Sequence, residues 1–340
     1  MNGQAQDAAG ESVPRAGRGS LFGRLIRVRE TGLVIVIAVL FAVMSFASPY
    51  FLTWENMRAM TMAFAVEGIV VVGMTILLIS GGIDLSVGAV IALTTMVSAA
   101  LVERHGWSPL AVIPLVLAMG TVFGAFMGFL IERFRLQPFI VTLAGMFLAR
   151  GLCYLISIDS ISITNAFYTE VAQIRIPVWG DASISISAII AIVVMLAAVF
   201  IAHCTAFGRA VYAVGGSEHS AMLMGLPVRR TLIGVYTLSG FCSALAGVIF
   251  TFYMLSGYGL HAVGLELDAI AAVVIGGTLL TGGVGYVAGT LFGALMLGII
   301  QTLISFDGSL SSWWTRIVVG ALLFVFCLLQ RFFTSRAPLR

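Results

Sequence analysis

Apolar runs of about 20 residues alternate with short polar stretches along most of this chain. A helix needs about 20 apolar residues to cross the hydrocarbon core of a bilayer, so each run predicts one spanning helix. The predicted fold is an all-α polytopic membrane protein, because no polar stretch is long enough to fold a soluble domain. The eighth span is short and interrupted by glycines, so nine or eleven spans are alternatives to ten. The ten spans are expected near residues 31–48, 57–80, 84–102, 109–131, 138–157, 184–203, 231–254, 266–280, 286–305 and 312–330.

The arginines predict how these spans are oriented. Loops on the cytoplasmic side of a membrane protein hold the excess of Lys and Arg. With an inner N-terminus, ten spans place three arginine-bearing stretches on that side, and the opposite loops carry few or balanced charges. Both termini are therefore expected in the cytoplasm. The three stretches contain Arg133 and Arg135, then Arg209, Arg229 and Arg230, then Arg331, Arg336 and Arg340.

The chain divides into three parts on this basis. Residues 1–30 are polar and are expected to form a disordered cytoplasmic tail. Residues 31–331 are expected to form the transmembrane domain, and residues 332–340 a cytoplasmic C-terminal tail. A cleaved signal peptide is the alternative for the first apolar run, but the polar leader before that run is unusually long.

Composition excludes several classes of function. Hydrophobic residues make up 60% of the 340 residues and charged residues only 10%. A soluble protein has about 25% charged residues, so membrane lipid must face most of this surface. The net charge of +3 is too small to predict nucleic-acid binding. The four cysteines lack metal or redox spacing, and the chain has no GxxxxGK[ST], HExxH or GxSxG motif. We therefore expect no ATP binding, no catalytic residues, no metal and no cofactor.

The longest predicted inner loop, residues 203–230, contains a short helical pattern. Ser217 and Glu218 follow two glycines, as at the start of a helix, and Gly225 ends the pattern. Residues 222–224 form a methionine-rich edge, and methionine adapts to irregular grooves on a partner. We expect a short helix along the membrane face, the alternative being a plain connector.

Two glycine-rich stretches, residues 80–88 and 276–285, interrupt the spans. Broken helices in a membrane protein are tolerated where they line a wet cavity or are buried in protein, and they indicate a transport pathway. Ionisable residues in or beside spans are also candidates for function: Glu67, Asp84, Arg150, Glu266, Asp268 and Arg316. The alternative is that both stretches are ordinary loops at the inner surface, with the carboxylates capping helices or forming ion pairs. The resulting candidate translocation pathway consists of Gly81, Gly82, Asp84, Ser86, Glu266, Asp268, Gly276 and Gly277.

Three long motifs occur in order along the chain. They run from Gly73 through Ser80-Gly81-Gly82-Ile83-Asp84-Leu85-Ser86-Val87-Gly88, from Gly208-Arg209 to Gly225, and from Glu266 through Gly276-Gly277-Thr278 to Gly283. Together they resemble the ribose-type branch of the ABC sugar permeases over residues 46–330. The resemblance implies a type II ABC importer-like permease fold with about ten transmembrane helices. Residues 307–315 are most similar to the YjfF-like permeases associated with galactofuranose import.

This resemblance also implies a mechanism and a set of partners. The chain would be the permease subunit of a binding-protein-dependent importer in the bacterial inner membrane, acting on a monosaccharide such as galactofuranose. A periplasmic sugar-binding protein would deliver the sugar to a heterodimer of this chain and a second permease subunit, and a separate ABC ATPase subunit would hydrolyse ATP. A short helix would pass motion from the ATPase to the spans. The implied coupling residues are Gly216, Ser217, Glu218, Met224 and Gly225.

Two other functions stay open from the residues themselves. An ion-coupled secondary transporter of small polar solutes is expected to carry a buried carboxylate or histidine relay in mid-span, where the positions here are nearly all apolar. A structural membrane scaffold is the third interpretation, and a permease gene would differ from it in lying beside genes for an ATPase and a binding protein.

Overall fold

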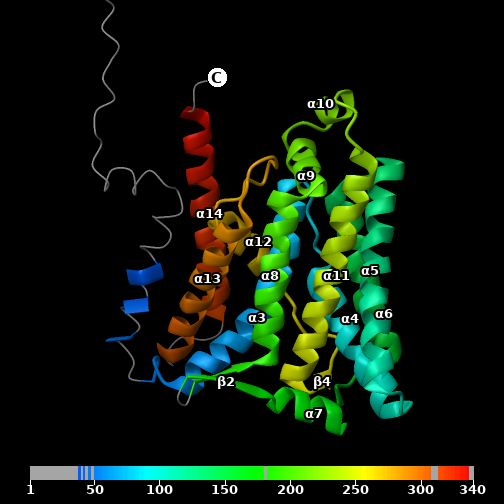
Figure 1. The fold of residues 1–340 in the computed structure, drawn as a ribbon, viewed down its shortest axis with the longest axis vertical. Coiled ribbons are helices and arrows are strands. Elements are labelled where there is room, and N and C mark those ends of the chain that lie inside the picture. The colour runs from blue at the N-terminus through cyan, green and yellow to red at the C-terminus, as the bar shows by residue number, and fades with distance from the viewer. Residues whose placement is uncertain are drawn as a thin grey trace, which may run out of the picture.

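The computed structural model describes residues 50–179, 182–307 and 313–336, with short helical pieces between residues 37 and 46. Helices dominate these residues (Figure 1). The helices are α3 (Trp54–Ile79), α4 (Val87–Ala99), the π-helical turn η1 (Ala100–Arg104), α5 (Pro109–Phe134), α6 (Pro138–Ile156), α7 (Ala166–Gln173), α8 (Ile186–Cys204), α9 (Ala206–Gly216), α10 (Glu218–Leu223), α11 (Val228–Met254), α12 (Leu265–Ile275), α13 (Val287–Asp307) and α14 (Trp313–Arg336). The strands are β1 (Ile161–Ser162), β2 (Arg175–Trp179), β3 (Ala182–Ser185) and β4 (Ser256–Gly257).

The apolar runs correspond closely to these helices. In the described part of the chain, seven helices are long and apolar enough to cross a membrane: α3, α4 continued by η1, α5, α6, α8, α11 and α13. The apolar part of α14 is shorter, and α12 has only 11 residues. The predicted all-α polytopic fold is confirmed, with the eighth predicted span reduced to α12. Most of the first predicted span, all of residues 1–30 and residues 337–340 lie outside the described residues.

The bundle has a buried centre and an apolar periphery. Nearly all side chains of α4 and most of those of α3, α11 and α12 are buried. Helices α5 and α6 lie at one edge (Figure 1), and both expose large apolar side chains such as Phe126, Phe147 and Leu148. A long exposed apolar face is stable where lipid tails, and not water, surround the helix.

Glycines bring α5 and α11 into backbone contact. The four-residue spacing of Gly120 and Gly124 predicts close helix packing in lipid. A Cβ atom on Gly124 would meet the carbonyl oxygen of Tyr236, and a Cβ atom on Gly240 would meet that of Gly120. No residue larger than glycine fits at these positions without moving one helix, which confirms the predicted packing role.

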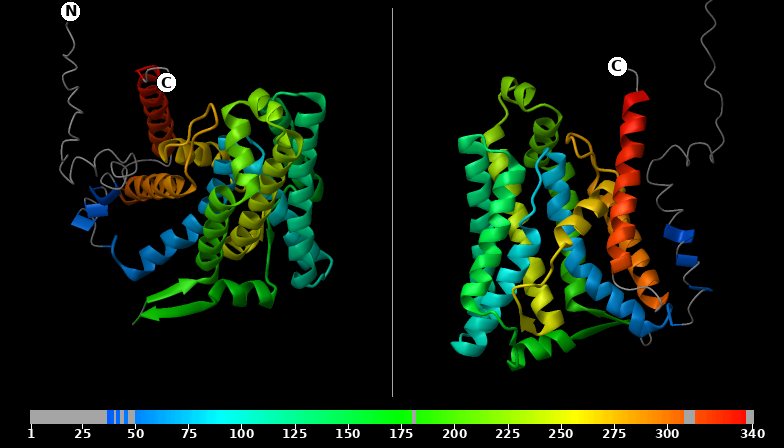
Figure 2. Two further views of the ribbon diagram at one scale, coloured as in Figure 1. Left: turned by 45° about the horizontal axis from the view of Figure 1, so that its top comes forward. Right: turned by 180° about the vertical axis from the view of Figure 1, so that it is seen from behind.

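The two ends of the bundle differ (Figures 1 and 2). One end, which we call the α10 end, carries α10 and the C-terminal end of α14. The opposite end, the α7 end, carries α7 and β2. The long loop after α6, expected only to be polar, contains α7 and strands of two antiparallel pairs. In these pairs β1 joins β4, and β2 joins β3.

Candidate functional site

The short helix expected after residue 216 is present as α10 and stands at the end of the molecule (Figure 1). Ser217 caps this helix, because its Oγ accepts a hydrogen bond from the backbone N–H of Ser220 at 3.2 Å. The turn that follows ends at Gly225, whose φ of +76° favours glycine. The residue pattern that predicted the helix therefore also determines where it begins and ends.

One edge of α10 is apolar and exposed. Ala221 is fully buried and fixes the helix on the body of the protein. Met222, Leu223 and Met224 point the other way, with 54%, 74% and 68% of their surface exposed. Three neighbouring apolar side chains exposed at the tip of a molecule are typical of a surface that binds a partner.

One ion pair attaches α10 to the end of α5, and a second attaches the start of α11 there. Arg135, the residue after α5, donates to the carboxylate of Glu218 at 2.5 Å. Arg229, in the first turn of α11, lies 2.9 Å from the carboxylate of Glu132. Both arginines are exposed, so each pair contributes only about 0–1 kcal/mol. The Arg135–Glu218 pair therefore orients α10 more than it stabilises it.

Three segments that are far apart in the sequence meet beside α9. We call this point the glycine junction, formed by Gly81, Gly215, Gly216, Gly282 and Gly283. The backbone N–H of Gly283 donates to the carbonyl oxygen of Ile79 at 2.8 Å. A Cβ atom on Gly215 would collide with the same oxygen, and one on Gly282 would lie 2.8 Å from the backbone N of Gly81. The two glycine-rich breaks thus lie against each other and against the end of α9.

The pathway glycines occupy these breaks. Gly81 and Gly277 have φ values of +81° and +94°, which explains the choice of glycine at both turns. Gly82 packs against the hydroxyl of Tyr236, and Gly276 packs against the backbone of α13 at Thr290. These contacts give all four glycines a structural reason to be present. Their role in a pathway stays a prediction.

Asp84 is buried and fully bonded within the protein. Its Oδ1 accepts hydrogen bonds from the backbone N–H and the Oγ–H of Ser86, at 2.8 and 2.6 Å. Its Oδ2 accepts one from Ser239 of α11 at 2.7 Å. Asp84 and Ser86 therefore join the turn before α4 to α11, and neither side chain caps α4, contrary to the capping alternative. Their role in a pathway stays a prediction.

A second group of polar side chains surrounds the start of α12. Glu266 and Asp268 lie in the first turn of this helix. Arg316 of α14 pairs with Asp268 at 3.4 Å. Glu67 of α3 lies close enough to Asp268 to interact electrostatically, as does Arg150 of α6 with Glu266. We call this group the polar cluster: Glu67, Arg150, His261, Glu266, Asp268 and Arg316.

The irregular segment between β4 and α12 is held by both arginines of the cluster. Arg150 donates through Nη1 to the carbonyl oxygens of Gly259 and His261, at 2.5 and 2.7 Å. Arg316 donates through Nη2 to the carbonyl oxygen of Val263 at 2.7 Å. Irregular backbone in a membrane protein is stable where other protein groups bind its free carbonyls. The two guanidinium groups supply that bonding here.

His261 lies in the same segment among aromatic rings. Its imidazole centroid is 5.0 Å from that of Phe250 and 5.8 Å from that of Tyr258. Its Nδ1 lies 3.4 Å from the Oγ1 of Thr95. Burial, and then the positive charge of Arg150, lowers the pKa of His261. The imidazole is therefore neutral at pH 7.

The predicted pathway residues fall in two places. Glu266 and Asp268 lie at the start of α12, whereas Gly276 and Gly277 follow its end. A helix of 11 residues is about 16 Å long, so these two groups are well separated. The three other charged members of the cluster come from α3, α6 and α14.

The polar cluster corrects the expectation that mid-span positions are nearly all apolar. Each helix contributes only one or two ionisable residues, and these come together only in the fold. Arg316 and Asp268, for example, are 48 positions apart. Five of the six members were predicted as candidates because they are ionisable residues in or beside spans, and only His261 was missed. No local spacing in the sequence indicated that they lie together.

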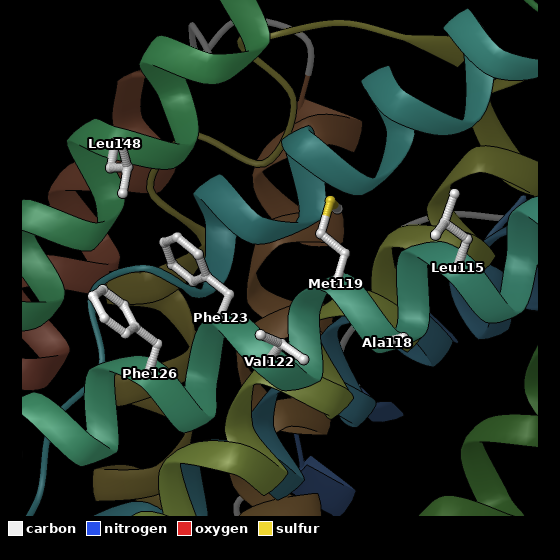
Figure 3. A pocket seen from close by; sticks show the side chains of 7 residues that line it. All are labelled: Leu115, Ala118, Met119, Val122, Phe123, Phe126 and Leu148. Atoms are coloured by element: carbon white, nitrogen blue, oxygen red, sulfur yellow. The ribbon is translucent and has the colours of Figure 1, made fainter.

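An open groove of about 430 Å³ lies on the outside of α5 (Figure 3). Figure 3 shows the side chains of Phe123 and Phe126 on α5, with Leu148 of α6 beside them. Every lining side chain is apolar, which suits lipid tails and not a polar solute. The full lining is Leu115, Ala118, Met119, Val122, Phe123, Phe126 and Leu148.

Comparison with known proteins gives matches over most of the chain. Residues 56–327 match the family described as branched-chain amino acid transport system / permease component. The inner membrane ABC transporter permease protein YjfF of Escherichia coli K12 is 52% identical over 264 residues, which cover 78% of this chain and 80% of that protein. The fructose import permease protein FruG of Bifidobacterium longum is 44% identical over 269 residues, covering 77% and 78%. The ribose import permease protein RbsC of Escherichia coli K12 is 37% identical over 297 residues, covering 84% and 88%. No solved structure matches the chain.

Proposed function

Because the chain belongs to the branched-chain amino acid transport system / permease component family, we propose that it is the permease subunit of an ATP-driven importer that carries a sugar across the bacterial inner membrane. Its relatives are named as permeases, which are transport components and not enzymes. Two of them are named for fructose and ribose import, which supports a sugar over an amino acid. The similarity of residues 307–315 to galactofuranose importers supports galactofuranose as the monosaccharide.

The exposed apolar edge of α10 is the observation that carries this proposal. Residues 222–224 stand at the tip of the molecule, where more than half of each residue's surface is exposed among the described residues. The chain has no nucleotide-binding motif, so energy from ATP would have to come through a second protein. An ABC ATPase that binds α10 would both cover the exposed apolar edge and supply the energy of ATP hydrolysis. Gly216, Ser217, Glu218, Met224 and Gly225 are then the coupling residues.

The remaining partners follow from the same arrangement. The α10 end faces the cytoplasm, where ATP is available, and both termini lie on that side. A periplasmic sugar-binding protein docks at the α7 end. A second, different permease completes the pathway as a heterodimer, as the resemblance to galactofuranose importers implies.

Reconstitution tests the energy source. The complete complex, with its ATPase, second permease and loaded binding protein, should take up sugar into proteoliposomes only when ATP is supplied on the α10 side. Uptake driven by a proton or sodium gradient without ATP would contradict the proposal and support an ion-coupled secondary transporter.

A pair of exposed residues tests the ATPase contact. Leu223→Asp should lower co-purification of the ATPase by about tenfold or more, as expected for a central apolar contact. Ile158 at the start of the loop after α6 is equally exposed, at 74%, so Ile158→Asp is the matched control and should keep the ATPase bound. Equal retention of the ATPase by both variants would show that α10 is only a connector.

A further inference from the structure

Two carboxylate oxygens in the polar cluster are buried without a hydrogen-bond partner among the described residues. They are Oε1 of Glu67 and Oε2 of Glu266. Glu67 is only 8% exposed and lies near the middle of α3, 12 residues before its end. A buried carboxylate oxygen without a donor is costly, so a group beyond the described residues is needed to bond it.

The fold brings the carboxylates of Glu67 and Glu266 each near the carboxylate of Asp268. Glu266 lies in the first turn of α12, which packs on α3, and its neighbour Asp268 interacts with Glu67. Gly88 of α4 leaves the room that the Glu266 carboxylate occupies, because a Cβ atom there would lie 2.5 Å from Oε2. Five helices (α3, α4, α6, α12 and α14) and an irregular segment thus surround one set of carboxylates.

The charges in the cluster indicate the kind of ligand. Three carboxylates face two guanidinium groups, and both guanidiniums also bind backbone carbonyls. An amino acid would add a further carboxylate to this set. A sugar adds several O–H donors and no charge, and carboxylates accept strong hydrogen bonds from such donors.

We propose that Glu67, Glu266 and Asp268 bind the hydroxyl groups of the sugar as it passes through the permease. This inference rests on the proposed sugar import and deepens it. Glu67 and Glu266 accept from the sugar with their unpartnered oxygens, while Arg316 holds Asp268 in place. Because the irregular segment after β4 leads directly into α12, its carbonyls and the ring of His261 border the same site.

The test compares two glutamates of α3 in the complete reconstituted complex. Glu67→Gln should lower ATP-driven uptake of radiolabelled galactose (which includes its furanose form), ribose or fructose by about tenfold, because a hydrogen bond to the sugar is lost. Glu55 lies exposed in the first turn of the same helix, so Glu55→Gln should keep parental uptake. ATPase activity stimulated by the loaded binding protein should persist in both variants, because α10 is unchanged.

Selectivity gives a second readout. Glu67→Gln and Glu266→Gln should each lower the ratio of ribose uptake to 2-deoxyribose uptake. If one variant inserts poorly into the membrane, the other variant tests the site. Parental uptake and selectivity in both glutamine variants would overturn the site alone. Absence of uptake of any of these sugars by the parental complex would overturn the proposed function and this site with it. Uptake that requires sodium, and is lost with Glu67→Gln, would assign the carboxylates to a cation instead.

Discussion

At the scale of single residues, Asp84 shows why a sequence pattern could not decide between two roles. A carboxylate after two glycines predicted either a helix cap or a pathway residue. All three hydrogen bonds to Asp84 come from Ser86 and Ser239. The bonds to Ser86 could be predicted from its position two residues later, although they do not cap α4. The bond to Ser239 on α11 could not, because the two residues are 155 positions apart.

His261 gives a pH dependence. Its lowered pKa means that the folded protein resists protonating this imidazole, while the unfolded chain takes up the proton near the usual value of about 6.5. The contribution of His261 to the free energy of unfolding is fully present above the usual pKa of about 6.5, and it is lost as the pH falls through the lowered pKa of the folded protein. The thermal unfolding midpoint should therefore drop between pH 7.5 and pH 5.

Substitution separates His261 from other titrating groups. His261→Asn should reduce the drop in the unfolding midpoint between pH 7.5 and pH 5. His219, which is exposed on α10, serves as the matched control, and His219→Asn should leave the drop unchanged. An unchanged drop in both variants would show that the burial of His261 is not linked to stability.

At the scale of elements, two adjacent glycines of α9 test the glycine junction. A Cβ atom on Gly215 would collide with the carbonyl oxygen of Ile79, whereas one on Gly216 would meet no atom within 4 Å. Gly215→Ala should therefore displace α9 and destabilise the protein by about 1–3 kcal/mol, as overpacking does. Gly216→Ala should be tolerated. Thermal unfolding of the solubilised protein measures the stability of both variants. Equal unfolding midpoints for Gly215→Ala and Gly216→Ala would mean that α9 does not pack as described.

Most helices could be predicted from the apolar runs alone, because length and hydropathy determine which segments cross a bilayer. The run at 138–157 became α6, which starts at Pro138, a residue that favours the first helical turn. The helix predicted at 84–102 begins three residues later than expected, at Val87, because the backbone N–H of Ser86 bonds to Asp84 in the turn before the helix. α7 and its strand pairs could not be foreseen, because β1 pairs with β4 from a segment about 95 residues away.

At the scale of the whole molecule, the arrangement predicts which parts lie on opposite sides of the membrane. Reporter fusions after Gln173, at the end of α7, and after Ser217, at the start of α10, should report opposite sides, with Ser217 in the cytoplasm. The same reporter joined after Asp159, in the loop that leads to α7, is the control and should agree with Gln173. Both main fusions on one side would contradict the orientation proposed here.

Membership of the permease family was predictable because three long motifs occur in order along the chain. The first and third motifs meet at the glycine junction, and the second contains α9 and α10. The expected family and transport role are confirmed by the relatives. The polar cluster was not predictable as a unit, because its six members come from α3, α6, α12, α14 and an irregular segment.

The glycine contact between α5 and α11 has a mechanical consequence. Gly240 lies at the midpoint of α11, whose 27 residues make a rod about 40 Å long. One end of that rod follows α10, and the other leads through β4 toward the polar cluster. A rod that rocks on a central fulcrum moves its two ends in opposite directions, by about 2 Å each for a tilt of about 5° over this length. Such a tilt of α11 separates it from its neighbours at one end of the bundle while bringing it closer to them at the other end.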